Sequence, residues 1–108
     1  MKGDLRIMWL MVFFDLPVTE ASERKAATQF RNFLLRDGYI MLQFSVYARP
    51  CYTQEAISKH LQRVQAHTPT SGSIRALMVT DKQYARMRVL LGKMHIEEQQ
   101  GGQQLLFF

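Results

Sequence analysis

The chain has 108 residues, the usual length of a single domain built around one hydrophobic core. Fourteen Lys and Arg against nine Asp and Glu give a formal net charge of +5, which favours an anionic partner such as nucleic acid or acidic lipid. The single cysteine, Cys51, excludes an intramolecular disulfide and a thiolate zinc cluster, and it fits a reducing compartment as a small apolar core residue.

The first predicted element is a strand over residues 7–14, whose apolar side chains do not alternate with polar ones. Both of its faces must therefore be covered, which predicts a central strand. Lys2 and Arg6 before this run are typical of a signal peptide, but Asp4 lies among them and no small-residue cleavage pattern follows. The run is also far too short to span a bilayer, so we expect a cytoplasmic protein without a membrane partner.

A helix is predicted to begin near Thr19 as N-cap, with Glu20 and Glu23 at the positive end of its dipole, and to end before Gly38. Its apolar side chains recur at helical spacing and form the expected buried stripe. The opposite side carries basic, amide and hydroxyl groups: Arg24, Lys25, Thr28, Gln29, Arg31, Asn32 and Arg36. Such a face can reach phosphates, and it is equally typical of an ordinary solvated helix surface.

Residues 39–43 and 44–49 predict two strands in a tight antiparallel pair, with Pro50 stopping the second. A second helix is predicted from residue 53 to about residue 67, followed by a loop over residues 68–72.

Residues 73–79 predict a fourth strand. Thr80 and Gln83 then have capping-box spacing, and a third helix is predicted to run to Gly92 with Tyr84, Met87 and Leu91 on one face.

The element order strand, helix, strand, strand, helix, strand predicts a ferredoxin-like βαββαβ fold of the α/β (α+β) class, with an extra helix at its end. We expect one domain over residues 1–96 and a polar linker with an apolar docking strand over residues 97–108. Both main helices should cover one face of the sheet, so the other face favours a homodimer, locked by the terminal strand pairing with the partner subunit. Residues 103–108 also resemble the short peptides that dock on replication sliding clamps.

Asp15 is the one residue with a chemical signal, because it follows the buried first strand and would lie near the surface that meets a partner subunit. Two such carboxylates facing each other would repel, and Mg²⁺ would relieve that repulsion. The alternative is that Asp15 only starts the turn before Pro17. His60, His67 and His95 show no metal-like spacing, and we interpret them as structural.

The segments Trp9-Leu10-Met11-Val12-Phe13-Phe14-Asp15-Leu16-Pro17 and Gly38-Tyr39-Ile40-Met41-Leu42-Gln43-Phe44-Ser45-Val46-Tyr47 resemble the two signatures of the CRISPR-associated Cas-two family, in its type II-like form. The resemblance implies a homodimer that bridges Cas-one-type integrase dimers and holds duplex DNA for spacer integration. It also implies a metal-dependent endonuclease on single-stranded RNA or duplex DNA, with Asp15 as catalytic residue and Mg²⁺ ligand. Ser45 and Arg49 are weaker carry-overs.

Two departures from the family pattern weigh against efficient cleavage. Met41 stands where a basic residue often precedes the glutamine, and no basic pair directly follows Asp15.

Duplex DNA held without sequence preference is bound through its phosphates by Arg and Lys. The predicted contacts are Arg24, Lys25, Arg31, Arg36, Lys59, Arg63 and Arg75. Two other functions remain open: a VapD-like toxin endoribonuclease, and a ferredoxin-like sensor of a small ligand.

Overall fold

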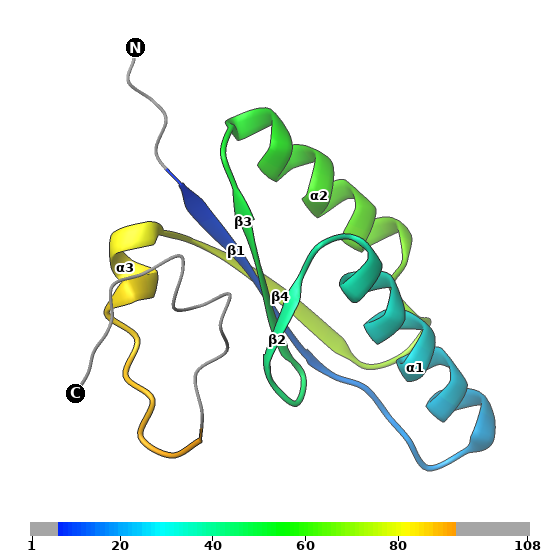
Figure 1. The fold of residues 1–108 in the computed structure, drawn as a ribbon. Coiled ribbons are helices and arrows are strands. Elements are labelled where there is room, and N and C mark those ends of the chain that lie inside the picture. Colours follow the sequence, from blue (N-terminus) through cyan, green and yellow to red (C-terminus); the bar gives the residue numbers. More distant parts are fainter. Residues whose placement is uncertain (1–6, 93–108) are drawn as a thin grey trace.

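The computed structural model describes residues 7–92, and the ribbon in Figure 1 shows one sheet with two long helices beside it. The elements in chain order are β1 (Met8–Asp15), α1 (Ala21–Arg36), β2 (Ile40–Gln43), β3 (Val46–Cys51), α2 (Gln54–Ala66), β4 (Ser73–Thr80) and α3 (Asp81–Ala85). The sheet is antiparallel, with strand order β2-β3-β1-β4. This is the predicted ferredoxin-like βαββαβ arrangement, and the predicted fold class is confirmed.

β1 is the central strand, as predicted, because it pairs with β3 on one side and with β4 on the other. Leu10, Val12 and Phe14 point to the face that α1 and α2 cover, and they form the main core with Phe30 of α1 and Ile57 of α2. The alternate side chains of β1 point to the opposite face, as the two-residue period of a strand requires.

The start of α1 differs from the prediction, because its N-cap is Glu20 and not Thr19. The Glu23 carboxylate accepts hydrogen bonds from the backbone N–H groups of Glu20 at 2.9 Å and Thr19 at 3.0 Å. A carboxylate three residues into the helix thus satisfies two free donors without the threonine hydroxyl. The predicted end at Gly38 is confirmed, since Gly38 has φ of +93° and directly follows the C-cap residue.

β3 also differs from the prediction, because Pro50 lies inside the strand opposite Trp9 and does not stop it. β2 pairs with β3 only as far as Ala48, so β3 has a free edge beyond that point. A proline is tolerated where its missing N–H faces no neighbouring strand. The residues predicted to begin this strand, Phe44 and Ser45, form the turn instead, and Ser45 takes φ of +68°.

α3 is shorter than predicted, with five residues in place of a helix running to Gly92. The predicted cap is present, because Thr80 Oγ1 accepts from the Gln83 N–H at 3.0 Å and Gln83 Oε1 accepts from the Thr80 N–H at 2.9 Å. Beyond it, the Met87 side chain is 39% exposed and Leu91 is 97% exposed. Of the expected apolar stripe only Tyr84 is buried within residues 7–92, and a short helix without packing is not stable.

α3 lies on the sheet face opposite α1 and α2, where Tyr84 stacks on Trp9 in a second apolar cluster. The outer edge of β4 pairs with no other strand of residues 7–92. No helix within these residues is long and apolar enough to cross a membrane. The predicted linker and terminal docking strand lie outside the described residues.

Candidate metal and nucleic-acid site

Asp15 is the last residue of β1, and its side chain is exposed. Three segments meet there, because Asp15 pairs with Ser73 at the start of β4 and the preceding Phe14 N–H donates to the Ser45 carbonyl oxygen at 3.1 Å. Gly72 approaches most closely, since a Cβ built on it would lie 2.8 Å from the Asp15 carbonyl oxygen. The main chain of Asp15 is therefore held between the β2–β3 turn and the loop before β4.

The alternation along β1 puts Asp15 on the same face as Phe13, opposite α1 and α2. Arg75 of β4 pairs with Phe13 while Ser73 pairs with Asp15, so Arg75 is the diagonal neighbour of Asp15 on that face. Diagonal neighbours in antiparallel strands lie roughly 7–8 Å apart, within reach of one shared phosphate. The predicted metal ligand and one predicted phosphate contact are thus brought together.

The surroundings of Asp15 fit a Mg²⁺ ion held by few protein ligands and not a site in which side chains supply most of the ligands. Within residues 7–92 no three His, Cys, Asp or Glu side chains gather in a way that could hold a metal ion. Mg²⁺ is commonly bound by one or two carboxylates, with water and substrate phosphate oxygens completing its shell. One chain supplies one carboxylate, so the donor set suits a site completed by substrate or by a second copy of Asp15.

The predicted cations of α1 and α2 fall into two groups. Arg24 donates to the Val18 and Thr19 carbonyl oxygens at 3.2 and 2.7 Å, and Arg63 forms an ion pair with Asp37 at 2.7 Å. Arg31 donates to the Thr28 hydroxyl at 3.1 Å. The other three make no hydrogen bond or ion pair within the described part of the chain and are exposed: Lys25, Arg36 and Lys59.

These cations do not form one surface with Arg75. The six on α1 and α2 lie in the helical layer, while Arg75 projects from the opposite face of the sheet. A single straight duplex cannot lie flat on both faces of one chain, so the predicted contacts divide into a helical set and the Asp15–Arg75 corner.

A buried side-chain hydrogen bond that the sequence did not suggest joins the end of α1 to α2. Asp37 Oδ2 lies 2.7 Å from His60 Nδ1, and these two side chains are only 8% and 4% exposed. Burial tends to raise the pKa of Asp37, but the hydrogen bonds and charges of His60 and Arg63 outweigh it and lower the pKa below 3.8. His60 is therefore structural, as the sequence analysis expected.

Tyr39 lies next to this pair, and its buried hydroxyl has no hydrogen-bond partner among residues 7–92. Burial, with the nearby charge of Asp37, raises the pKa of Tyr39 well above 10. Cys51 is fully buried, and burial raises the pKa of its thiol, as expected for an inert core cysteine.

Comparison with known proteins identifies the family. A family model for the CRISPR associated protein Cas2 matches residues 8–87. The chain belongs to this family. The resemblance to the Cas-two signatures is thereby confirmed.

Several curated Cas2 proteins are similar over most of their length. The CRISPR-associated endoribonuclease Cas2 of Acidovorax ebreus (strain TPSY) is 53% identical over 85 residues, which cover 79% of this chain and 83% of that protein. The protein of the same name from Flavobacterium psychrophilum is 42% identical over 103 residues, which cover 95% of this chain and 90% of that protein. The one from Streptococcus mutans serotype c is 43% identical over 86 residues, covering 80% of this chain and 79% of that protein.

In this Cas2-family chain, the Cas2 match includes Asp15, Ser73 and Arg75, which lie at one corner of the sheet. Sequence reasoning placed Asp15 and Arg75 separately. The pairing register between β1 and β4 is what makes them neighbours, and no local pattern specifies that register.

Proposed function

We propose that this chain acts in CRISPR adaptation as a homodimer that holds duplex DNA through its phosphates and bridges Cas-one-type integrase dimers for spacer integration. The observation that carries the proposal is a set of exposed cations on the helical layer that make no hydrogen bond or ion pair within residues 7–92: Lys25, Arg36 and Lys59. Cations that are free of protein partners can neutralise phosphates at no cost in folding stability. A twofold axis doubles this surface.

The homodimer is supported by the edge of β4 and the face of the sheet that α1 and α2 leave open. β4 is eight residues long and contains no proline, and Leu77 and Met78 on it are 54% and 37% exposed. A long apolar edge strand is a template for pairing with another chain. The apolar sequence of the partner's residues 103–108 would suit this edge as an added strand.

A second activity, Mg²⁺-dependent cleavage of phosphodiester bonds in RNA or duplex DNA, is favoured by the Asp15–Arg75 corner and by relatives named endoribonucleases. Asp15 would hold the ion, and Arg75 would neutralise the phosphate beside it. When bound, Mg²⁺ would polarise the phosphate and lower the pKa of an attacking water. The exposure of Asp15 lets a phosphate backbone approach it directly.

The decisive experiment measures binding and cleavage of one labelled duplex DNA and one single-stranded RNA, with Mg²⁺ or with a chelator. Wild type is compared with Asp15→Asn and with the control Glu55→Gln, an exposed carboxylate in the first turn of α2. We expect tight duplex binding in every variant, and metal-dependent cutting that only Asp15→Asn abolishes. Cleavage that persists in Asp15→Asn would show that Asp15 is not the catalytic residue. The proposal that the protein holds duplex DNA would still stand.

Duplex holding is tested separately with the double variant Lys25→Ala/Lys59→Ala over a salt series. Each lost phosphate contact should reduce the slope of log affinity against log salt by about one unit. Lys82→Ala, on α3 at the other face of the sheet, serves as the matched control. A double variant that binds like wild type at every salt concentration would rule out the helical layer as the duplex surface.

Dimer formation and bridging are tested by light scattering. The wild type should be a dimer, Leu77→Lys on the β4 edge should be a monomer, and addition of a Cas-one-type integrase should give a complex of two integrase dimers per Cas2 dimer. A monomeric wild type would contradict the bridging role.

A further inference from the structure

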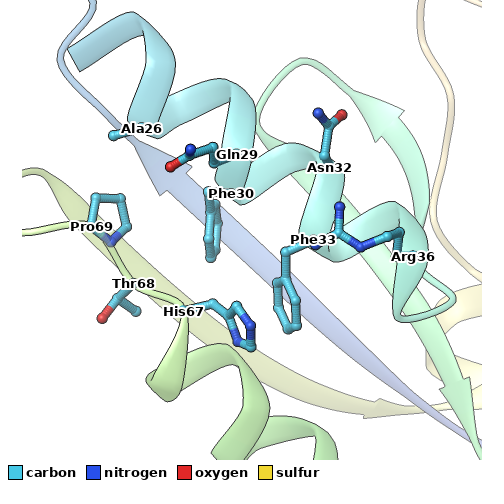
Figure 2. Close-up of a pocket in the computed structure, with 9 residues that line it drawn as sticks. All are labelled: Ala26, Gln29, Phe30, Asn32, Phe33, Arg36, His67, Thr68 and Pro69. Atoms are coloured by element: carbon cyan, nitrogen blue, oxygen red, sulfur yellow. The ribbon is translucent and has the colours of Figure 1, made fainter. Parts of the chain in front are cut away.

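A hollow of about 500 Å³ lies between α1 and the chain that follows α2. Figure 2 shows its wall of aromatic rings, with Phe30 and Phe33 from α1 and His67 from the end of α2. Gln29, Asn32 and Arg36 stand along the α1 side. The hollow is on the helical layer, away from the Asp15–Arg75 corner on the other face of the sheet.

His67 is held in one orientation at this hollow. Its ring stacks on Phe33 with centroids 3.9 Å apart and an interplanar angle of 10°. Nδ1 lies 2.8 Å from the Arg63 carbonyl oxygen, which can only accept, so Nδ1 carries the proton and donates. In the neutral ring Nε2 is then an acceptor, and no described residue bonds to it. His67 is thus an exposed, oriented aromatic ring with a free polar edge.

The polar side chains at the hollow are free to bind. Gln29, Asn32 and Arg36 are exposed and make no hydrogen bond or ion pair within residues 7–92. No Asp or Glu lines the hollow, so its charge is that of Arg36. Side-chain amides suit the donor and acceptor edge of a nucleobase, and a guanidinium suits a phosphate.

We propose that this hollow binds one unpaired nucleotide of a single-stranded nucleic acid, with its base stacked against the His67 ring, its base edge on Gln29 and Asn32, and its phosphate on Arg36. Single strands are recognised by stacking of splayed bases on aromatic side chains together with contacts to the backbone. A volume of about 500 Å³ lies within the range of roughly 300–1,000 Å³ that small-ligand sites occupy. The proposal deepens the nucleic-acid function proposed above and rests on it, adding a site that a paired base cannot enter.

The test measures fluorescence anisotropy of a labelled single-stranded RNA, a single-stranded DNA of the same sequence, and the corresponding DNA duplex. His67→Ala should weaken single-strand binding about tenfold, as the loss of one stacked base does, and leave duplex affinity within twofold of wild type. His67→Phe, which keeps the aromatic ring, should retain most of the affinity. Tighter binding of the RNA would indicate contact with its 2′-hydroxyl, and equal binding would indicate recognition of base and phosphate alone.

Asn32→Ala repeats the test at an exposed residue whose substitution should leave stability within about 0.5 kcal/mol of wild type, with Gln62→Ala on the exposed side of α2 as matched control. The assignment is overturned if neither His67→Ala nor Asn32→Ala changes single-strand affinity, or if both weaken duplex binding equally. The Lys25→Ala/Lys59→Ala double variant reports on duplex holding alone. If the wild type does not bind duplex DNA, the proposed function is contradicted. If His67→Ala still weakens binding of the single strand in that case, the site proposed here is retained.

Discussion

Gly72 packs directly against the main chain of Asp15, because a Cβ on Gly72 would lie 2.8 Å from the Asp15 carbonyl oxygen. The same Cβ would lie 2.7 Å from Leu16 Cδ2, and Gly72 has φ of +109°, a conformation that side chains disfavour. Glycine is thus required here for space and for backbone geometry. The loop before β4 holds the end of β1 in place through this contact.

Gly72→Ala is expected to lower the free energy of unfolding by about 3 kcal/mol, because a strained backbone is combined with a clash against a carbonyl group that cannot move aside. Urea denaturation measures the loss. Gly92→Ala is the control, since Gly92 has φ of +119° but no atom of the described residues 7–92 lies within 4 Å of its Cβ position. Gly92→Ala should cost only the backbone term, about 1 kcal/mol, and equal losses in the two variants would contradict the contact with Asp15.

The fold was predictable because several elements carry strong local signals: the apolar run of β1, the helical stripe of α1 and the cap at Thr80. The errors arose where distant residues decide the outcome. Pro50 is accepted in β3 because β2 pairs with β3 only as far as Ala48. The stripe after Tyr84 does not continue as a helix, since Met87 and Leu91 stay exposed at 39% and 97% in the described part of the chain.

Part of the site was predictable because it also carries a strong local signal in the sequence. Asp15 was identified from its place after a buried strand. Arg63 pairs with Asp37, which directly follows α1, and His67 stacks on Phe33 of α1. Both partners are distant in the sequence, so no local spacing indicates these contacts. The sequence indicated only a structural role for His67. Its ring is oriented by stacking on Phe33, and this contact forms only when the end of α2 packs beside α1.

The Asp37–His60–Arg63 cluster predicts a defined dependence of stability on pH. The folded pKa of Asp37 is lowered, so the unfolded chain binds the proton more strongly. The stabilisation is fully present above the unfolded pKa of about 3.9 and is lost as the pH falls through the lower folded pKa. Asp37→Asn should therefore cost about 2 kcal/mol at neutral pH, the size of a hydrogen bond to a charged group, and progressively less in acid.

Urea denaturation of wild type and Asp37→Asn at neutral pH and below pH 3.8 measures this difference. Glu55→Gln, an exposed carboxylate of α2 without an ion pair among the described residues, is the control and should show no such dependence. A stability difference that stays constant with pH would contradict the charged role of Asp37.

The two groups of helical cations should respond differently to removal. Lys25→Ala should leave the unfolding free energy within about 0.5 kcal/mol of wild type, because Lys25 bonds to nothing within residues 7–92. Arg63→Ala should lower stability by about 1–2 kcal/mol, because Asp37 loses one of the two side chains that hydrogen-bond to its carboxylate. Thermal melts paired with duplex titrations separate the two effects. A destabilised Lys25→Ala would mean that Lys25 has a structural contact.

Trp9 offers a direct probe of the second face of the sheet, because it is the only tryptophan and is 3% exposed. Its Nε1 donates to Asp81 Oδ1 at 2.7 Å, and its ring stacks on Tyr84 with centroids 3.9 Å apart. Tyr84→Ala should expose the indole and shift its fluorescence emission to longer wavelength. Asp81→Ala should keep the stack and lose one hydrogen bond to a charged acceptor, at a cost of about 1.5–3 kcal/mol.

Lys82→Ala, between these two residues on α3, is the control and should change neither emission nor stability. An unchanged emission maximum in Tyr84→Ala would show that other side chains cover Trp9. Because Trp9 and Asp15 lie on one face of β1, the emission shift also reports whether variants at the β4 edge disturb the surface on which the proposed dimer forms.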